Sequence, residues 1–93
     1  MNAYEFSTIG YFIEHYFNWS MDYSDLENCI VDFLLNENVI NIKAFKKEIE
    51  TLYMLNCPEI IREVSYKLGN RGMPTDKALD MIKLLYTKIQ EEK

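Results

Sequence analysis

One short segment contains the residues with the clearest capacity for chemistry. Residues 16–27 read YFNWSMDYSDLE and combine aromatic side chains with Asp22, Asp25 and Glu27. Paired carboxylates perform acid–base catalysis when their surroundings separate their pKa values. Asp22 and Asp25 share only their proximity, and His15, the single imidazole, has no Ser or Cys placed beside it by the sequence. We therefore expect no catalytic residues and no enzymatic activity.

Metal and cofactor sites are not expected either. A calcium loop needs alternating oxygen ligands, a turn glycine and a closing bidentate Glu, whereas DYSDLE has no glycine and leads into a predicted helix. Cys and His residues do not cluster at ligand spacing. Acyl carriers attach their prosthetic group to the Ser of an Asp-Ser-Leu motif, but the order here is Ser24-Asp25-Leu26. That similarity is one of composition only.

Hydrophobic periodicity predicts an all-α fold, a compact single-domain bundle of about five short amphipathic helices over residues 1–93. A chain of 93 residues has room for one domain, and three Gly and two Pro are too few for a turn-rich β sandwich. The predicted helices span residues 3–17, 25–37, 43–56, 58–68 and 76–91. The first directs these residues inward: Phe6, Ile9, Phe12, Ile13, Tyr16 and Phe17.

The start of the second helix explains part of the acidic segment. Ser24, with Glu27 three residues later, matches the S-x-x-E capping box, and Asp25 suits the positive end of the helix dipole. Asp22 lies outside this helix and has no such role. From Asp25 to Glu37 the pattern is apolar around most of the circumference. We expect a central helix that shows solvent only an acidic edge.

Single residues mark the other boundaries. Asn41 is expected to cap the third helix, and Pro58 fits the first turn of the fourth, where its missing N–H costs nothing. Gly69 should end the fourth helix, and Thr75 should cap the last. Trp19 is expected to fill the corner between the first two helices.

Charge is distributed unevenly along the chain. Residues 1–42 contain seven acidic residues and no Lys or Arg, while residues 43–93 carry a net charge of +2 within the overall −5. Nucleic-acid binding is not expected, because affinity for phosphate comes from Lys and Arg. The group Lys43, Lys46 and Lys47 is followed at once by acidic residues, as on a solvated helix face.

An acidic surface with Tyr side chains suits a basic protein partner. Tyr buries a large area at little rotamer cost and is enriched in interface hot spots, and complementary charge speeds encounter and rejects wrong partners. The predicted contact residues are Asp22, Tyr23, Asp25, Asp32 and Glu37, with Tyr11 and Glu14 beside them.

The expected compartment is the cytoplasm. The N-terminus shows no basic-then-apolar signal pattern, and no run of apolar residues is long enough for a membrane span. Cys29 and Cys57 are too few for a disulfide framework and are expected to be reduced. No membrane or small-molecule partner is expected.

The segment YFIEHYFNWSMDYSDLENCIVDFLL, followed by FKKEIETLYML, resembles the small α-helical immunity proteins of contact-dependent growth inhibition systems. The similarity covers about residues 6–68. Asn18 stands where such proteins often have Asp, and the final helix lacks their aromatic-Trp start. The match depends on these residues, most of which we interpret as scaffold: Tyr16, Phe17, Trp19, Phe33, Leu34, Glu48, Ile49 and Leu52.

The resemblance implies a bacterial, non-enzymatic protein that binds the toxic C-terminal domain delivered by a neighbouring cell, often a nuclease, and blocks its active site or substrate groove. Each immunity protein recognises one toxin, so the contact surface cannot be transferred from relatives. The acidic, Tyr-containing surface is suitable, since a nuclease is basic where it holds phosphate. The alternative is a small acidic adaptor or regulatory domain that binds a basic endogenous protein.

Overall fold

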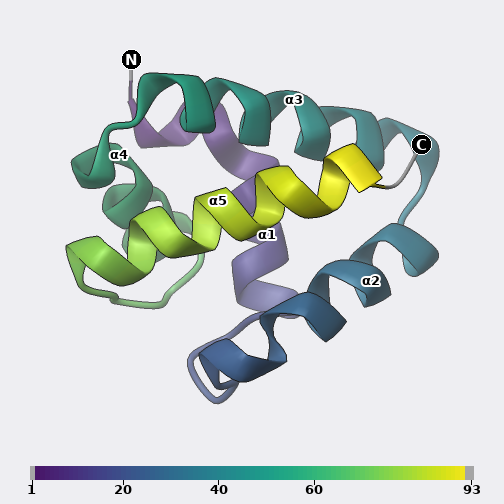
Figure 1. Cartoon of the computed structure of the whole chain (residues 1–93), viewed down its shortest axis with the longest axis horizontal. Helices are drawn as coiled ribbons and strands as arrows, with labels where there is room; N and C mark the ends of the chain where they lie inside the picture. The colour runs from purple at the N-terminus through teal and green to yellow at the C-terminus, as the bar shows by residue number, and fades with distance from the viewer. Residues whose placement is uncertain (1, 92–93) are drawn as a thin grey trace.

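The computed structural model describes residues 2–91; residue 1 and residues 92–93 of the predicted domain lie outside this range. The described chain forms five α-helices and no strand (Figure 1), which confirms the all-α prediction. The helices are α1 (Ser7–His15), α2 (Leu26–Asn36), α3 (Val39–Leu55), α4 (Pro58–Glu63) and α5 (Thr75–Glu91). Three short segments complete them: the 3-10 turns η1 (Ala3–Phe6) and η2 (Tyr23–Asp25), and η3 (Val64–Leu68), a π-helical continuation of α4.

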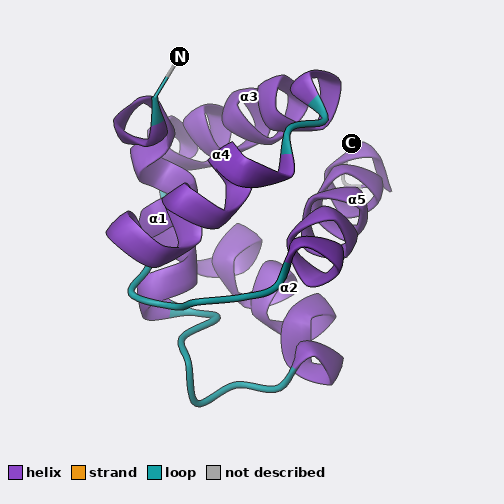
Figure 2. Cartoon of the chain, turned by 90° about the vertical axis from the view of Figure 1, so that its left-hand side faces the viewer, coloured by secondary structure: helices purple, strands orange, loops and turns teal. Residues whose placement is uncertain are grey.

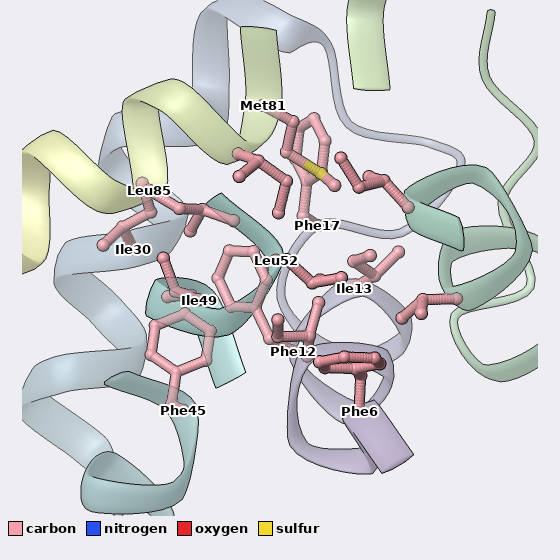
Figure 3. Close-up of a cluster of buried hydrophobic side chains, with 14 of the residues drawn as sticks. Phe6, Phe12, Ile13, Phe17, Ile30, Phe45, Ile49, Leu52, Met81 and Leu85 are labelled. Atoms are coloured by element: carbon pink, nitrogen blue, oxygen red, sulfur yellow. The ribbon is translucent and has the colours of Figure 1, made fainter. Parts of the chain in front are cut away.

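The core lies between α1, α3, α5 and the inner face of α2 (Figure 3). The first predicted helix directs its apolar face into this core as expected, although it is divided into η1 and α1. Aromatic rings fill the centre: the Phe33 and Phe45 ring centroids are 4.2 Å apart, and Phe12 lies 5.1 Å from Phe45. All three side chains are fully buried, and burial of each such ring stabilises the fold by about 1.5–3 kcal/mol.

Two glycines let α1 and η3 pack backbone against backbone. A Cβ on Gly10 would stand 2.3 Å from the Leu68 Cβ, and one on Gly69 would stand 2.5 Å from the Ile13 Cγ2. Gly69 ends the fourth helix as predicted, but with a φ of −99°. Its role is therefore the close packing, and Asn70, with a φ of 56°, provides the left-handed turn.

The predicted Ser24–Glu27 capping box is wrong. The 3-10 turn η2 precedes α2, so the N-cap position moves back to Asp22, whose backbone N–H donates to the Asp25 carboxylate at 3.0 Å. Glu27 instead forms an ion pair with Lys88 of α5 at 3.2 Å. Asp22, which the sequence left without a structural role, therefore has one.

The cap predicted at Asn41 is also misplaced. The Asn38 side chain accepts the backbone N–H of Asn41 at 2.8 Å, so α3 begins at Val39, four residues earlier than expected. At the other end of the molecule, Glu48 of α3 accepts the backbone N–H of Ile9 at 2.9 Å and supports the first turn of α1. A carboxylate distant in sequence thus satisfies a helix N-terminus that has no side-chain cap of its own.

Helix α2 lies at the edge of the fold and not at its centre (Figures 1 and 2). Its inner face buries Leu26, Cys29, Ile30 and Phe33. On its outer side, however, Val31 is 42% and Leu35 is 76% exposed. The prediction of a central helix with only an acidic edge is wrong, because α2 packs one face into the core and leaves Val31 and Leu35 exposed on the other.

Candidate functional site

Five of the seven predicted contact residues occupy two regions, one at each end of α2. The first joins α1 to the end of α2 and contains Tyr11 and Glu37, linked by a hydrogen bond across the two segments. The second is the turn before α2, with Asp22, Tyr23 and Asp25. The structure brings the members of each region together but distributes the whole set along the helix.

Glu37 connects three helices through its carboxylate. The hydroxyl groups of Tyr16 and Tyr11 donate to it at 2.5 Å and 3.0 Å, and the Asn41 side-chain amide donates at 2.9 Å. These donors, with Tyr16 first, hold the pKa of Glu37 below its usual range. The same hydrogen bond raises the pKa of Tyr16 to about 12. The arrangement gives Glu37 and Tyr11 a structural role at this junction.

The turn before α2 also has internal partners. The half-buried Tyr23 ring packs edge-on against Phe17, with ring centroids 5.7 Å apart. Two cations lie over it: the Arg71 guanidinium carbon at 4.7 Å and the Lys77 ammonium at 5.0 Å from the ring centroid. Asp25 accepts the Asp22 backbone N–H. Of this group, Asp22 is the residue with an exposed side chain.

Three predicted contact residues therefore present carboxylates to solvent: Glu14, Asp22 and Asp32. Within residues 2–91, none of the three forms an ion pair with Lys or Arg, and Glu14 lies 3.5 Å from the His15 ring. Asp32 lies midway along α2, between the two regions. Among the predicted contact residues, these three carboxylates are exposed, whereas Glu37 and Asp25 are half-buried.

Trp19 was misjudged from the sequence. The prediction that it fills the helix corner is wrong, because its side chain is 74% exposed. Phe17 and Tyr23, on either side of it in sequence, fill this corner with the Arg71 side chain. An aromatic residue between two predicted helices gives no sequence signal that distinguishes a buried indole from an exposed one.

Arg71 is the residue that sequence reasoning missed most completely. It is 7% exposed and donates from one guanidinium nitrogen to the carbonyl oxygens of Phe17, Asn18 and Met21, at 3.3, 2.7 and 2.9 Å. Its guanidinium carbon lies 4.0 Å from the centroid of the Phe17 ring. Arg71 thereby fixes the turn that carries Trp19. A single Arg in the segment NRGMP carried no pattern that pointed to this contact.

A second unpredicted feature is an apolar corner where α2 meets α3. Besides Val31 and Leu35, it exposes Val39 and Ile40, at 66% and 79%. The signal was available in the sequence, because the apolar residues of 25–37 cover more of the helix than one buried face requires.

The groups that could perform nucleophilic or metal chemistry are separated. His15 is exposed and lies against the Tyr11 ring, with centroids 4.6 Å apart. Burial raises the pKa of the Cys29 thiol, and both cysteines are free. Across the described residues, no group of three His, Cys, Asp or Glu side chains could hold a metal ion.

None of the helices formed by residues 2–91 has the length and apolar character to cross a membrane.

No protein-family model, curated protein or solved structure matches this chain.

Proposed function

We propose that this protein is an immunity protein, which binds a basic toxin domain in the bacterial cytoplasm and neutralises it without catalysis. The observation that supports this most directly is the set of exposed carboxylates Glu14, Asp22 and Asp32, which have no Lys or Arg partner within the described chain. They lie in a stretch of 42 residues that contains no basic side chain other than His15.

Their chemistry fits a toxin that acts on nucleic acid. Such an enzyme concentrates Lys and Arg where it holds phosphate, and carboxylates fixed on helices can take the place of the phosphates. Long-range attraction between the two charge patterns speeds encounter, while burial of aromatic and apolar side chains slows dissociation. Covering the phosphate-binding groove is sufficient to block the toxin.

Capture from the native cell tests this function. The tagged chain should retain a basic toxin domain identified by mass spectrometry, and an equimolar amount of the chain should abolish the nuclease activity of that domain. Capture of an unrelated housekeeping protein with micromolar affinity, and no inhibition of any toxin, would contradict the proposal. That result would favour the alternative, an acidic adaptor.

A further inference from the structure

The turn that carries Trp19 is rigid and displays its indole to solvent. Large aromatic side chains are highly buried on average, yet Trp19, the only Trp in the chain, is 74% exposed. The packing of the corner beneath the turn does not require Trp19, because Phe17 and Tyr23 already fill it with Arg71.

The backbone on both sides of Trp19 is fixed. Arg71 donates to the Asn18 and Met21 carbonyl oxygens, at 2.7 and 2.9 Å. The Asn18 side chain accepts the Ser20 backbone N–H at 2.9 Å, and the Met21 N–H donates to the Asn18 carbonyl at 2.9 Å. The turn is therefore ordered before any partner arrives, so little backbone entropy is lost on binding.

The surroundings of the indole are polar and acidic. A hollow of about 250 Å³ lies beside it, lined by Glu14, Asn18, Ser20, Gly69 and Asn70 as well as Trp19. Asp22 follows three residues later and is exposed. The positive charge of Arg71 lies beneath the turn and is 7% exposed. The flat apolar indole next to exposed carboxylates complements a basic surface that contains an apolar socket.

We propose that Trp19 is the anchor of the interface, inserting into an apolar socket of the basic toxin domain while a Lys or Arg beside that socket enters the hollow next to Glu14. This inference deepens the proposed function and rests on it. It assigns the strongest single contact to a residue outside the acidic set. Interface hot spots are enriched in Trp, and a rim of weaker contacts normally excludes water around them.

Titration of the toxin domain identified by capture tests the anchor. Trp19→Ala should weaken binding by about 30-fold or more. Trp19→Phe should weaken binding by a smaller factor. Tyr66→Ala is the matched control, since Tyr66 lies on η3 and is 69% exposed; its affinity should match that of the unaltered chain. The melting temperatures of all three variants should be unchanged, because these side chains make few contacts in the folded protein.

Acrylamide quenching of the single Trp provides a second readout. In the isolated chain, quenching should approach that of a free Trp amide and should not depend on protein concentration. Saturation with the toxin domain should strongly protect the indole. Protection that grows with the concentration of the chain alone would show that a second copy covers Trp19, and would overturn the proposal.

The outcomes separate the two proposals. If Trp19→Ala binds the toxin domain with unaltered affinity, the anchor is wrong while the immunity function stands. If the chain inhibits no toxin, both proposals fail.

Discussion

The Arg71 guanidinium donates a 2.7 Å hydrogen bond to the Asn18 carbonyl oxygen, joining positions that are 53 residues apart in the chain. This contact fastens the turn between α1 and α2 to the loop before α5. It explains how an exposed Trp can be presented without a flexible loop.

Replacing Arg71 should test this fastening. Arg71→Leu leaves the carbonyls of Phe17, Asn18 and Met21 without their donor and should lower the free energy of unfolding by about 3 kcal/mol. Arg71→Lys keeps the charge but loses the planar stacking over Phe17, and it should lower the free energy of unfolding by a smaller amount. Urea denaturation measures both. A loss below about 0.5 kcal/mol for Arg71→Leu, the range of ordinary surface substitutions, would show that the turn does not depend on this residue.

The close packing of α1 against η3 predicts that Gly10 does not tolerate an added methyl group. Gly10→Ala gains about 1 kcal/mol of helix propensity. It also places a methyl group 2.3 Å from the Leu68 Cβ, and overpacking of this kind costs about 1–3 kcal/mol or more. We expect net destabilisation by thermal unfolding. Gly72→Ala is the control, because nothing lies within 4 Å of its added Cβ. Equal melting temperatures for the two variants would contradict the close approach.

The hydrogen bond from Tyr16 to Glu37 predicts a late step in alkaline titration. It raises the pKa of Tyr16 to about 12. Because the folded-state pKa exceeds the unfolded-state value, the stabilisation from Tyr16 is complete below about pH 10 and is lost as the pH rises through about 12. Ultraviolet absorbance of tyrosinate should show this late step in the unaltered chain. Tyr16→Phe should remove the step near pH 12 and leave the Tyr11 titration, whose pKa is also raised by its hydrogen bond to Glu37. Tyr66→Phe should leave the step near pH 12 in place, and persistence of that step in Tyr16→Phe would refute the assignment.

Charge reversal on α2 tests the acidic surface separately from Trp19. Asp32→Lys should slow association with the toxin domain and reduce the dependence of the association rate on salt, because the attraction acts at long range. Asp80→Lys on α5 is the matched control, since it changes the same charge at an exposed helical position outside the N-terminal half. We expect association rates for Asp80→Lys close to those of the unaltered chain. Identical rates for both variants would place the interface elsewhere.

Asp32 is preferable to Asp22 for this purpose. Asp22 occupies the N-cap position of η2, and loss of a capping residue typically costs about 1 kcal/mol. A change at Asp22 therefore mixes stability with binding unless it is made as Asp22→Asn, which preserves a capping side chain.

Periodicity predicted the helices and their buried faces well, since every apolar residue of the first helix at core spacing is packed, with Tyr16 half-buried. Caps were predicted poorly. Ser24 and Asn41 are reasonable N-cap residues, but Asp22 and Asn38 stand two and three positions earlier and have equally suitable side chains. Local preference could not choose between them, because the choice depends on where the chain leaves the preceding helix.

The candidate site was harder to predict, because exposure depends on tertiary packing. Glu37 was predicted as an exposed acidic contact residue, because only the folded structure shows that the Tyr16 and Tyr11 hydroxyl groups bind it. Trp19 was expected to fill the helix corner, because the sequence does not show that Arg71, a residue distant in the chain, binds this turn. Both errors concern contacts over more than 20 positions, which no local pattern describes.

The affinity of the captured partner tests the central claim most directly. Titration of the purified toxin domain with the unaltered chain should give a one-to-one complex with nanomolar or tighter affinity, about −12 kcal/mol or stronger, and binding should abolish toxin activity. A complex of micromolar affinity with a housekeeping protein, with no toxin inhibited, would contradict the immunity function.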